Sequence, residues 1–223
     1  MPMNIAIDGP VGAGKSSIAD QVAQRLHILH LDTGAMYRTV ALYMLRNGID
    51  PQDEQTVSAH CGEADVRVAY RDGAQRTMLG GEDVSDLIRT GEVSAAASAI
   101  SKWSAVRRRM VAAQREIAAT ADMLIDGRDI GTVVFPDAEL KLFMTADTAV
   151  RACRRYKELT GKGMSVTMEE VERNIRERDK ADMSRAVSPL RQADDAIVLD
   201  NSHMSVDEQM AWFMNEFQLK MKN

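Results

Sequence analysis

A glycine-rich loop near the start of the chain constrains its fold more than any other feature of the sequence. Residues 5–19 read IAIDGPVGAGKSSIA, a short apolar run followed by a turn, a lysine and two serines. The phosphate-binding pattern G-x-x-x-x-G-K-S is matched by Gly9, Gly14, Lys15 and Ser16. A helical pattern follows directly. The chain is therefore predicted to begin with a strand, a phosphate-binding loop and a helix.

Each residue type in this loop suits the binding of a nucleotide phosphate. Glycines let the backbone curl until consecutive N–H groups face phosphate oxygens, and the following helix N-terminus adds to the attraction. Lys15 is expected to neutralise the β- and γ-phosphates, Ser16 to ligate Mg²⁺ and Ser17 to bind the α-phosphate. The predicted ATP-binding residues of the loop are Gly9, Pro10, Val11, Gly12, Ala13, Gly14, Lys15, Ser16 and Ser17. The loop predicts a nucleotide but does not identify what receives its phosphate.

Five short apolar runs predict the strands of a parallel sheet. They lack strict polar alternation and are separated by helical patterns, as expected for strands buried on both faces. The runs are residues 4–8, 28–32, 123–126, 140–144 and 196–200. With 223 residues the chain is long enough for one sizeable core. We predict an α/β fold, a doubly wound three-layer α/β/α architecture around a five-stranded parallel sheet.

Two stretches depart from this alternation and are predicted to form appended lobes. In residues 61–100, Val66, Val68 and Tyr70 alternate before an Asp-Gly turn, which indicates a small, partly antiparallel insertion. Residues 151–191 predict a basic helical pair, with a Thr-x-x-Glu capping box at the start of the second helix. The single domain is expected to keep its core in residues 1–60, 101–150 and 192–223.

The composition argues against several classes of protein. A net charge of −5 and a pI near 5.5 are unlike a general nucleic-acid binder, which usually has a basic excess. No basic apolar leader and no run approaching ~18 apolar residues is present, so we expect a soluble cytoplasmic protein without a membrane partner. Cys61 and Cys153 are expected to be reduced thiols. A monomer that binds no nucleic acid is expected.

Local charge predicts a second anion opposite the loop. Residues 151–191 hold 11 Lys or Arg against 7 Asp or Glu, a net of +4, and arginine outnumbers lysine 8 to 3. Arginine is the side chain that binds phosphate through two parallel hydrogen bonds. The spacing predicts one helix face that carries Arg178, Asp182 and Arg185. A second cluster, on the preceding helix, comprises Arg151, Arg154 and Arg155.

Other phosphate-loop proteins fit the sequence less well. A GTPase switch needs D-x-x-G, which is absent, and the near match to its guanine motif at residues 179–182 lies in a helical stretch. A motor ATPase usually ends a strand in Asp-Glu, whereas glycine and arginine follow Asp126. Arg38 and Arg128 follow predicted strands at the edge where open α/β sheets bind ligands. We infer a kinase with a phosphate-bearing acceptor, which needs no general base, and we find no obvious His–carboxylate pair.

The motifs along the chain resemble those of the bacterial cytidylate kinases, a family of nucleoside monophosphate kinases. They are IDGPVGAGKSS (7–17), LDTGAMYR (31–38), GEDVSDLIRTGEVSAAAS (81–98), DGRDIGTVVFPDA (126–138) and RDKADMSRAVSPL (178–190). They run in the family's order from near residue 4 to near residue 202, so the resemblance covers almost the whole chain. It implies a P-loop kinase whose insertion at 61–100 binds the monophosphate and whose lid at 151–191 closes over ATP.

The resemblance also implies roles for single residues. Arg38 and Arg128 resemble the clamp on the acceptor phosphate, and Asp129 a reader of the exocyclic amine of cytosine. The implied CMP site comprises Thr33, Tyr37, Arg38, Ser98, Arg107, Arg128, Asp129, Arg178, Asp182 and Arg185. The lid residues implied to complete the ATP site are Arg151, Arg154 and Arg155. The residues implied to act in catalysis are Lys15, Arg128, Asp129, Arg178 and Arg185.

The leading hypothesis is transfer of the γ-phosphate of ATP to CMP or dCMP with Mg²⁺. One alternative is a kinase of the same design that acts on UMP or on a small phosphate-free alcohol. Another is a regulatory or nucleic-acid-binding switch that hydrolyses nucleotide without an acceptor. Asp126 is left either as a cap of its strand or as a partner of Lys15 or a magnesium-bound water. His27 and His30 are expected to pack without a metal.

Overall fold

The computed structural model describes residues 2–222, and a five-stranded parallel sheet forms its centre. The strands lie in the order β2 (Leu29–Asp32), β6 (Met123–Gly127), β1 (Asn4–Asp8), β7 (Leu140–Thr145) and β8 (Ile197–Asp200). In the middle of the sheet, Asp8 of β1 lies opposite Gly127 on one side and Phe143 on the other. All five strands therefore end at the same edge, where ligands of open α/β sheets bind.

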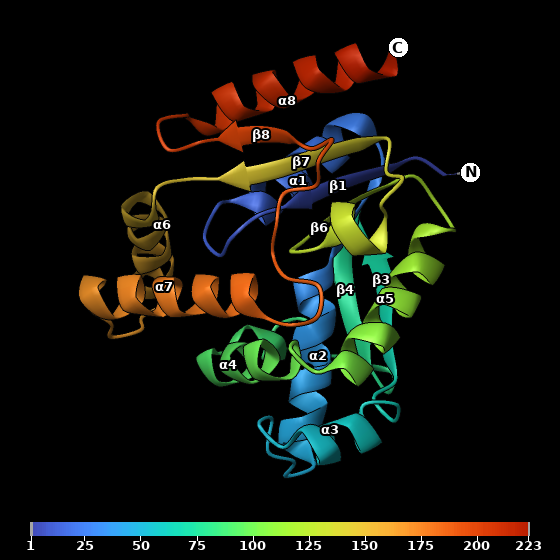
Figure 1. Cartoon of the computed structure of the whole chain (residues 1–223), viewed down its shortest axis with the longest axis vertical. Coiled ribbons are helices and arrows are strands. Elements are labelled where there is room, and N and C mark those ends of the chain that lie inside the picture. The colour runs from blue at the N-terminus through green and yellow to red at the C-terminus, as the bar shows by residue number, and fades with distance from the viewer. Residues whose placement is uncertain (1, 223) are drawn as a thin grey trace.

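Helices cover both faces of this sheet, so the predicted three-layer α/β/α architecture is confirmed (Figure 1). One face packs on α1 (Lys15–Leu26) and α8 (Val206–Met221), and the other on α2 (Thr33–Arg46) and α5 (Ser104–Ala118). Side chains of a strand alternate between faces. In β1, Ile5 and Ile7 accordingly join the core beneath α1 and α8, while Ala6 joins the core beneath α2.

The first lobe is built from a small antiparallel sheet and short helices. Its strands are β3 (Val66–Arg71), β4 (Ala74–Leu79) and β5 (Glu82–Asp83). Asp72 and Gly73 form the predicted hairpin turn, with φ values of 53° and 76°. The accompanying helices are α3 (Glu54–His60), the 3₁₀ turn η1 (Leu87–Arg89) and α4 (Gly91–Ile100). The alternation seen in the sequence thus predicts this sheet correctly.

Side chains of the small sheet close the outer edge of β2. The Tyr70 hydroxyl donates to the main-chain oxygen of His30 at 3.1 Å. The Gln75 amide accepts from the main-chain N–H of Asp32 at 2.7 Å and donates to its carbonyl oxygen at 3.4 Å. The edge strand that leads into the site is therefore held in place by the first lobe.

The second lobe is the helical pair α6 (Thr148–Gly161) and α7 (Met168–Ser184), at the left of Figure 1. Thr167 and Glu170 form the predicted capping box at the start of α7. The prediction that Arg185 shares a helix face with Arg178 is wrong, because α7 ends at Ser184. Arg185 has extended backbone angles and begins the chain that returns to β8. Both arginines nevertheless line the same cavity.

Cys61 and Cys153 are free thiols, as expected. Within residues 2–222, no helix is long and apolar enough to cross a membrane.

Candidate active site

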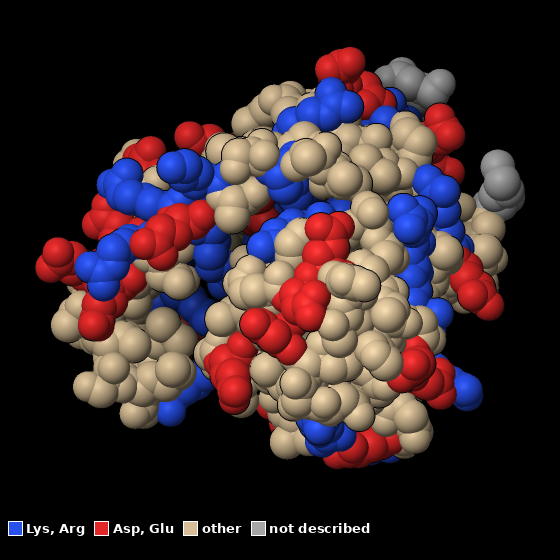
Figure 2. Space-filling view, turned by 60° about the horizontal axis from the view of Figure 1, so that its bottom comes forward, with Lys and Arg blue, Asp and Glu red and all other residues tan. Residues whose placement is uncertain are grey.

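A cavity of about 570 Å³ lies at the carboxyl ends of the strands, between the two lobes. Its wall is formed by the phosphate-binding loop, α2, the small sheet, α4, the segment after β6, and the helices α6 and α7 of the second lobe. Figure 2 shows a hollow between the lobe at the left and the main body, with Lys and Arg side chains at its margin. The geometry thus brings both lobes and the loop around one basic cavity.

The phosphate-binding loop runs from Gly9 to Gly14, between β1 and α1. A Cβ atom at Gly9 would lie 2.0 Å from the carbonyl oxygen of Met144, so only glycine fits there. Gly14 has a φ of 89°, in the left-handed region that favours glycine. The loop and helix residues that line the cavity are Val11, Gly12, Gly14, Lys15, Ser16 and Ser17. The residues that support it from behind, all buried, are Gly9, Pro10 and Ala13.

The Lys15 amine lies over this loop. Its Nζ donates to the carbonyl oxygens of Gly9 at 2.8 Å and Pro10 at 2.9 Å. The side chain is buried. Burial, aided by repulsion from Arg128, lowers the pKa of Lys15 to about 7. An anion that entered the cavity would favour the charged form of this amine.

A chain of polar side chains lies behind the loop, and it corrects the expectation that no His–carboxylate pair exists. The Ser16 hydroxyl donates to Oδ2 of Asp126 at 2.8 Å. Oδ1 of the same carboxylate lies 2.9 Å from Nε2 of His30, and Nδ1 of His30 lies 2.6 Å from Oδ1 of Asp20. His30 was expected only to pack. In the structure it instead bridges α1 and β6.

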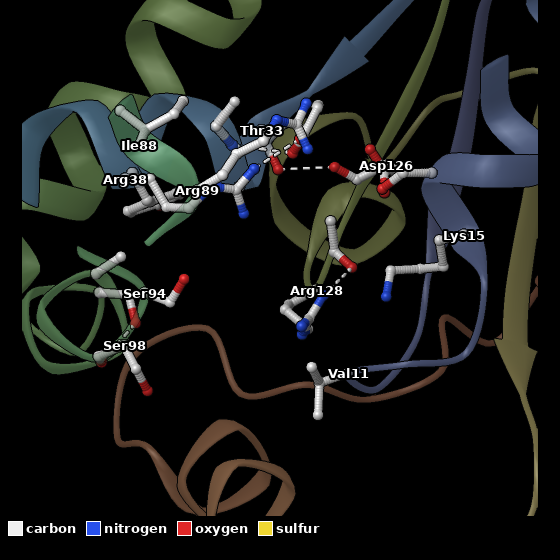
Figure 3. Close-up of a pocket in the computed structure, with 18 of the residues that line it drawn as sticks. Val11, Lys15, Thr33, Arg38, Ile88, Arg89, Ser94, Ser98, Asp126 and Arg128 are labelled. Atoms are coloured by element: carbon white, nitrogen blue, oxygen red, sulfur yellow. Dashed lines mark hydrogen bonds and ion pairs between the residues drawn. The ribbon is translucent and has the colours of Figure 1, made fainter. Parts of the chain in front are cut away.

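Two of the residues expected to hold the acceptor, Arg38 and Ser98, lie at the far end of the cavity from Lys15. Figure 3 shows Arg38 and Ser98 there, with Arg128 between them and Lys15. Nη2 of Arg38 donates to Oδ2 of Asp32 at 2.8 Å, and this pair is only partly buried. The Thr33 hydroxyl donates to a main-chain carbonyl of β6 at 2.7 Å, which ties the start of α2 to the adjacent strand.

A buried ion pair lines the cavity. Nη2 of Arg107 donates to the Asp129 carboxylate, and both side chains are almost fully buried. The guanidinium of Arg185 lies 3.7 Å from the same carboxylate. Arg107 also lies over the ring of Tyr37, 5.7 Å from its centroid. Burial raises the pKa of Tyr37 to about 12, so its phenol stays protonated beside this ion pair.

Three arginines surround a single carboxylate in the middle of the cavity. Nε of Arg128 donates to Asp182 at 2.8 Å, and Arg185 lies 3.7 Å from the other oxygen of that carboxylate. Burial raises the pKa of Asp182, but the hydrogen bond from Arg128 and the charges of all three arginines together outweigh it, and the net shift is downward. Burial and repulsion from Arg128 lower the pKa of Arg178 to about 10. Positive charge in excess of the carboxylate is what a transferred phosphoryl group requires.

The arginines of α6 lie differently from one another. Arg151 is buried and donates to the carbonyl of Val11 in the loop and to Asp179 of α7. Arg154 donates to the side chain and main chain of Asn201. Arg155 lines the cavity. Arg151 and Arg154 do not, so Arg155 is the one of the three that lines the cavity, while Arg151 contacts the loop from behind.

Two supporting residues were missed by the sequence interpretation. The buried carboxylate of Asp8 accepts from the main-chain N–H groups of Ile130 and Gly131, each at 2.7 Å, and so fixes the segment that carries Asp129. Burial raises the pKa of Asp8 to about 6. Asn201, which is fully buried, donates to the main-chain oxygen of Ala13 at 2.9 Å. The only signal for either residue is its position at the end of a strand.

Fold and site together define a P-loop kinase, with a phosphate-binding loop at one end of a basic cavity and several arginines along the rest of its wall. A model of the family described as cytidylate kinase matches residues 5–219. A cytidylate kinase of Bacteroides fragilis is 45% identical over 227 residues, covering 99% of this chain and 98% of that protein. One of Porphyromonas gingivalis is 46% identical over 225 residues, covering 97% of this chain and 96% of that protein. The chain belongs to the cytidylate kinase family.

A solved structure shares the fold of this chain. The crystal structure of an uncharacterized protein from Eubacterium ventriosum has a TM-score of 0.54 and is 12% identical, covering 97% of this chain and 98% of that one. Membership of the family confirms the expected resemblance and makes the chain a phosphotransferase. ATP and a divalent metal are what such a kinase requires.

Proposed function

We propose that the protein transfers the γ-phosphate of ATP to CMP or dCMP, with Mg²⁺, and releases ADP and CDP or dCDP. One observation carries the proposal: a single cavity is lined by Lys15 of the loop, by Arg128 and by the Arg107–Asp129 pair. The curated relatives named above are cytidylate kinases, which supports the same acceptor. We further propose that it acts as a cytoplasmic monomer without a nucleic-acid partner.

In this proposal the loop binds ATP and the end of the cavity away from the loop binds CMP. Arg38 and Arg128 hold the acceptor phosphate, while Arg178 and Asp182 contact the sugar. Asp129 accepts from the exocyclic amine of cytosine, and Arg107 and Ser98 donate to the ring acceptors. Uracil presents a carbonyl where cytosine presents the amine, so a buried carboxylate would meet an acceptor and lose its hydrogen bond. This wall therefore favours cytosine.

Transfer requires alignment and positive charge. An oxygen of the ionised CMP phosphate attacks the γ-phosphorus and forms a new O–P bond. The bond to the bridging oxygen breaks, and its electrons leave with ADP. Lys15, Arg128, Arg178 and Arg185 neutralise charge on the phosphoryl group as it moves. The attacking oxygen carries no proton, so the step needs no general base.

The residues at the start of α1 suit a magnesium ion. Mg²⁺ prefers hard oxygen ligands and keeps several waters. The Ser16 hydroxyl would hold the ion, and the Asp126 carboxylate, 2.8 Å from that hydroxyl, would accept a hydrogen bond from a water ligand. The bound ion would supply positive charge to the β- and γ-phosphates. Both groups are fixed by the fold before nucleotide binds.

We also propose that the insertion at 61–100 and the lid at 151–191 close over the two substrates and exclude water from the transferred phosphate. Both lobes contribute residues to the cavity wall. Hydrogen exchange with both nucleotides bound should show protection in both segments. Exchange that is unchanged in either segment would contradict closure of that lobe.

ADP release in a coupled assay across CMP, dCMP, UMP, AMP and GMP tests the function. We expect CMP and dCMP to stimulate release far more than the others. Replacement of Lys15 with Met, the matched control, should remove the stimulated rate. Equal rates with all five acceptors, or hydrolysis that no acceptor changes, would contradict the proposal in favour of a broader kinase or a switch.

A further inference from the structure

His30 joins two carboxylates behind the phosphate-binding loop. Its ring lies 2.6 Å from Asp20 through Nδ1 and 2.9 Å from Asp126 through Nε2. His30 and Asp126 are almost fully buried, whereas the Asp20 side chain is 62% exposed. The ring thus joins a buried carboxylate to an exposed one at the wall of the cavity.

The hydrogen-bond geometry fixes the charge of this ring. An ionised carboxylate can only accept hydrogen bonds, and a neutral imidazole donates from one nitrogen alone. Both ring nitrogens of His30 face carboxylate oxygens, so both donate and the ring is an imidazolium. Burial would lower the pKa of His30, but the hydrogen bonds to Asp126 and Asp20 outweigh it and raise the pKa to about 10.

The second oxygen of Asp126 connects the imidazolium to the loop. Oδ1 accepts from His30 and Oδ2 accepts from the Ser16 hydroxyl at 2.8 Å, so the carboxylate plane is held from both sides. The Lys15 amine and the Arg128 guanidinium are further charged groups that act on Asp126. The main chain of His30 is fixed in turn by the Tyr70 hydroxyl at 3.1 Å. The chain from Asp20 to Ser16 is therefore continuous.

Charge gives this chain a second effect. Asp20 and Asp126 carry −1 each and His30 carries +1, a net of −1; a neutral residue at position 30 would leave −2. That extra negative charge would lie beside the loop that binds polyphosphate. It would repel the phosphates, because charges at a buried site are only weakly screened by solvent.

We propose that His30 is a positioning residue of the nucleotide site, which orients the Asp126 carboxylate toward Ser16 and offsets negative charge behind the phosphate-binding loop. The inference deepens the proposed function and rests on it, since it takes the loop to be the site of ATP. His30 touches neither substrate. It acts through Asp126.

A pair of variants of similar length separates charge from packing. His30→Lys keeps a cation that can donate to both carboxylates, whereas His30→Gln is neutral and can donate to one at most. ATP affinity is measured by calorimetry with EDTA present, so that the readout does not depend on metal or turnover. We expect His30→Gln to bind ATP about tenfold more weakly and His30→Lys to stay within about threefold of wild type. The exposed His27, replaced by Asn to suit its φ of 55°, is the control and should bind ATP as wild type does.

Equal ATP affinity in the two His30 variants would overturn the proposal, because a packing role alone would not distinguish them. Should either variant fail to fold, wild-type protein still decides the question. In ¹⁵N imidazole spectra at pH 8, the His30 signal is expected to show both nitrogens protonated, and a neutral ring would overturn the proposal. Failure of wild-type protein to bind ATP at all would instead refute the proposed function and leave the state of the ring unaffected.

Discussion

ATP binding at pH 8 should draw about one proton into the protein, and Lys15 is the group that takes it up. Burial and the neighbouring Arg128 lower the pKa of its amine from 10.5 to about 7. Polyphosphate in the cavity would place negative charge against this amine and against Arg128, which removes the main repulsion. The pKa of Lys15 should then return toward its ordinary range.

The size of the effect follows from the pKa of about 7 for Lys15. At pH 8 about a tenth of the amine is charged in the free protein and nearly all of it is charged when ATP is bound, an uptake of about 0.9 proton. At pH 6 most of the amine is already charged, so the uptake by Lys15 falls to about 0.1 proton. The uptake therefore rises with pH across this interval.

Calorimetry in buffers of different ionisation enthalpy measures this uptake directly. The Lys15→Arg variant is the control, because a guanidinium remains charged at pH 8 and should take up almost no proton. An uptake below about 0.2 proton at pH 8 in wild-type protein would refute the reasoning. An equal uptake in wild-type protein and in Lys15→Arg would assign the proton to another group.

Four further substitutions test the remaining parts of the site. Asp129→Ala should weaken CMP binding by about 1–3 kcal/mol with little change in ATP binding, because Arg107 loses its buried partner. Calorimetry measures both affinities, and an unchanged preference for CMP over UMP would contradict the prediction. Arg178→Ala or Arg185→Ala should lower kcat by about two orders of magnitude or more in the coupled assay. A loss confined to thermal stability would make these arginines structural partners. Asn201→Ala should lower the free energy of unfolding by about 2–4 kcal/mol, because two buried partners lose their hydrogen bonds. Urea denaturation measures this, and a loss below about 1 kcal/mol would contradict the prediction.

Much of the fold is predictable because its signals are local. Each apolar run became a strand, and the Asp-Gly turn became a hairpin. The second strand begins one residue later than predicted, at Leu29. His27 ends α1 with a φ of 55°, a left-handed cap position that glycine or asparagine usually occupies. Its main-chain N–H donates to carbonyl oxygens in the last turn of that helix. Histidine is not a residue type from which a left-handed helix cap is predicted.

The site is less predictable because it depends on how elements pack. The loop is contiguous in sequence and was predicted in full, whereas Asp20, His30 and Asp126 come together from α1, β2 and β6. Their meeting depends on the register that sets β2 beside β6. Helical spacing likewise predicts that Arg151 and Arg154 share a lobe, but it does not predict that they turn toward main-chain carbonyls and Asn201.

The contacts of the small sheet with β2 also bear on how the chain behaves among other copies of itself. An uncovered edge strand offers main-chain groups that a strand of another molecule can pair with, and such pairing leads to aggregates. Here Tyr70 and Gln75 occupy outward-facing main-chain groups of His30 and Asp32. Deletion of residues 66–79 would remove part of the cavity wall. It would also uncover the outer edge of β2, which could then pair with a strand of another molecule.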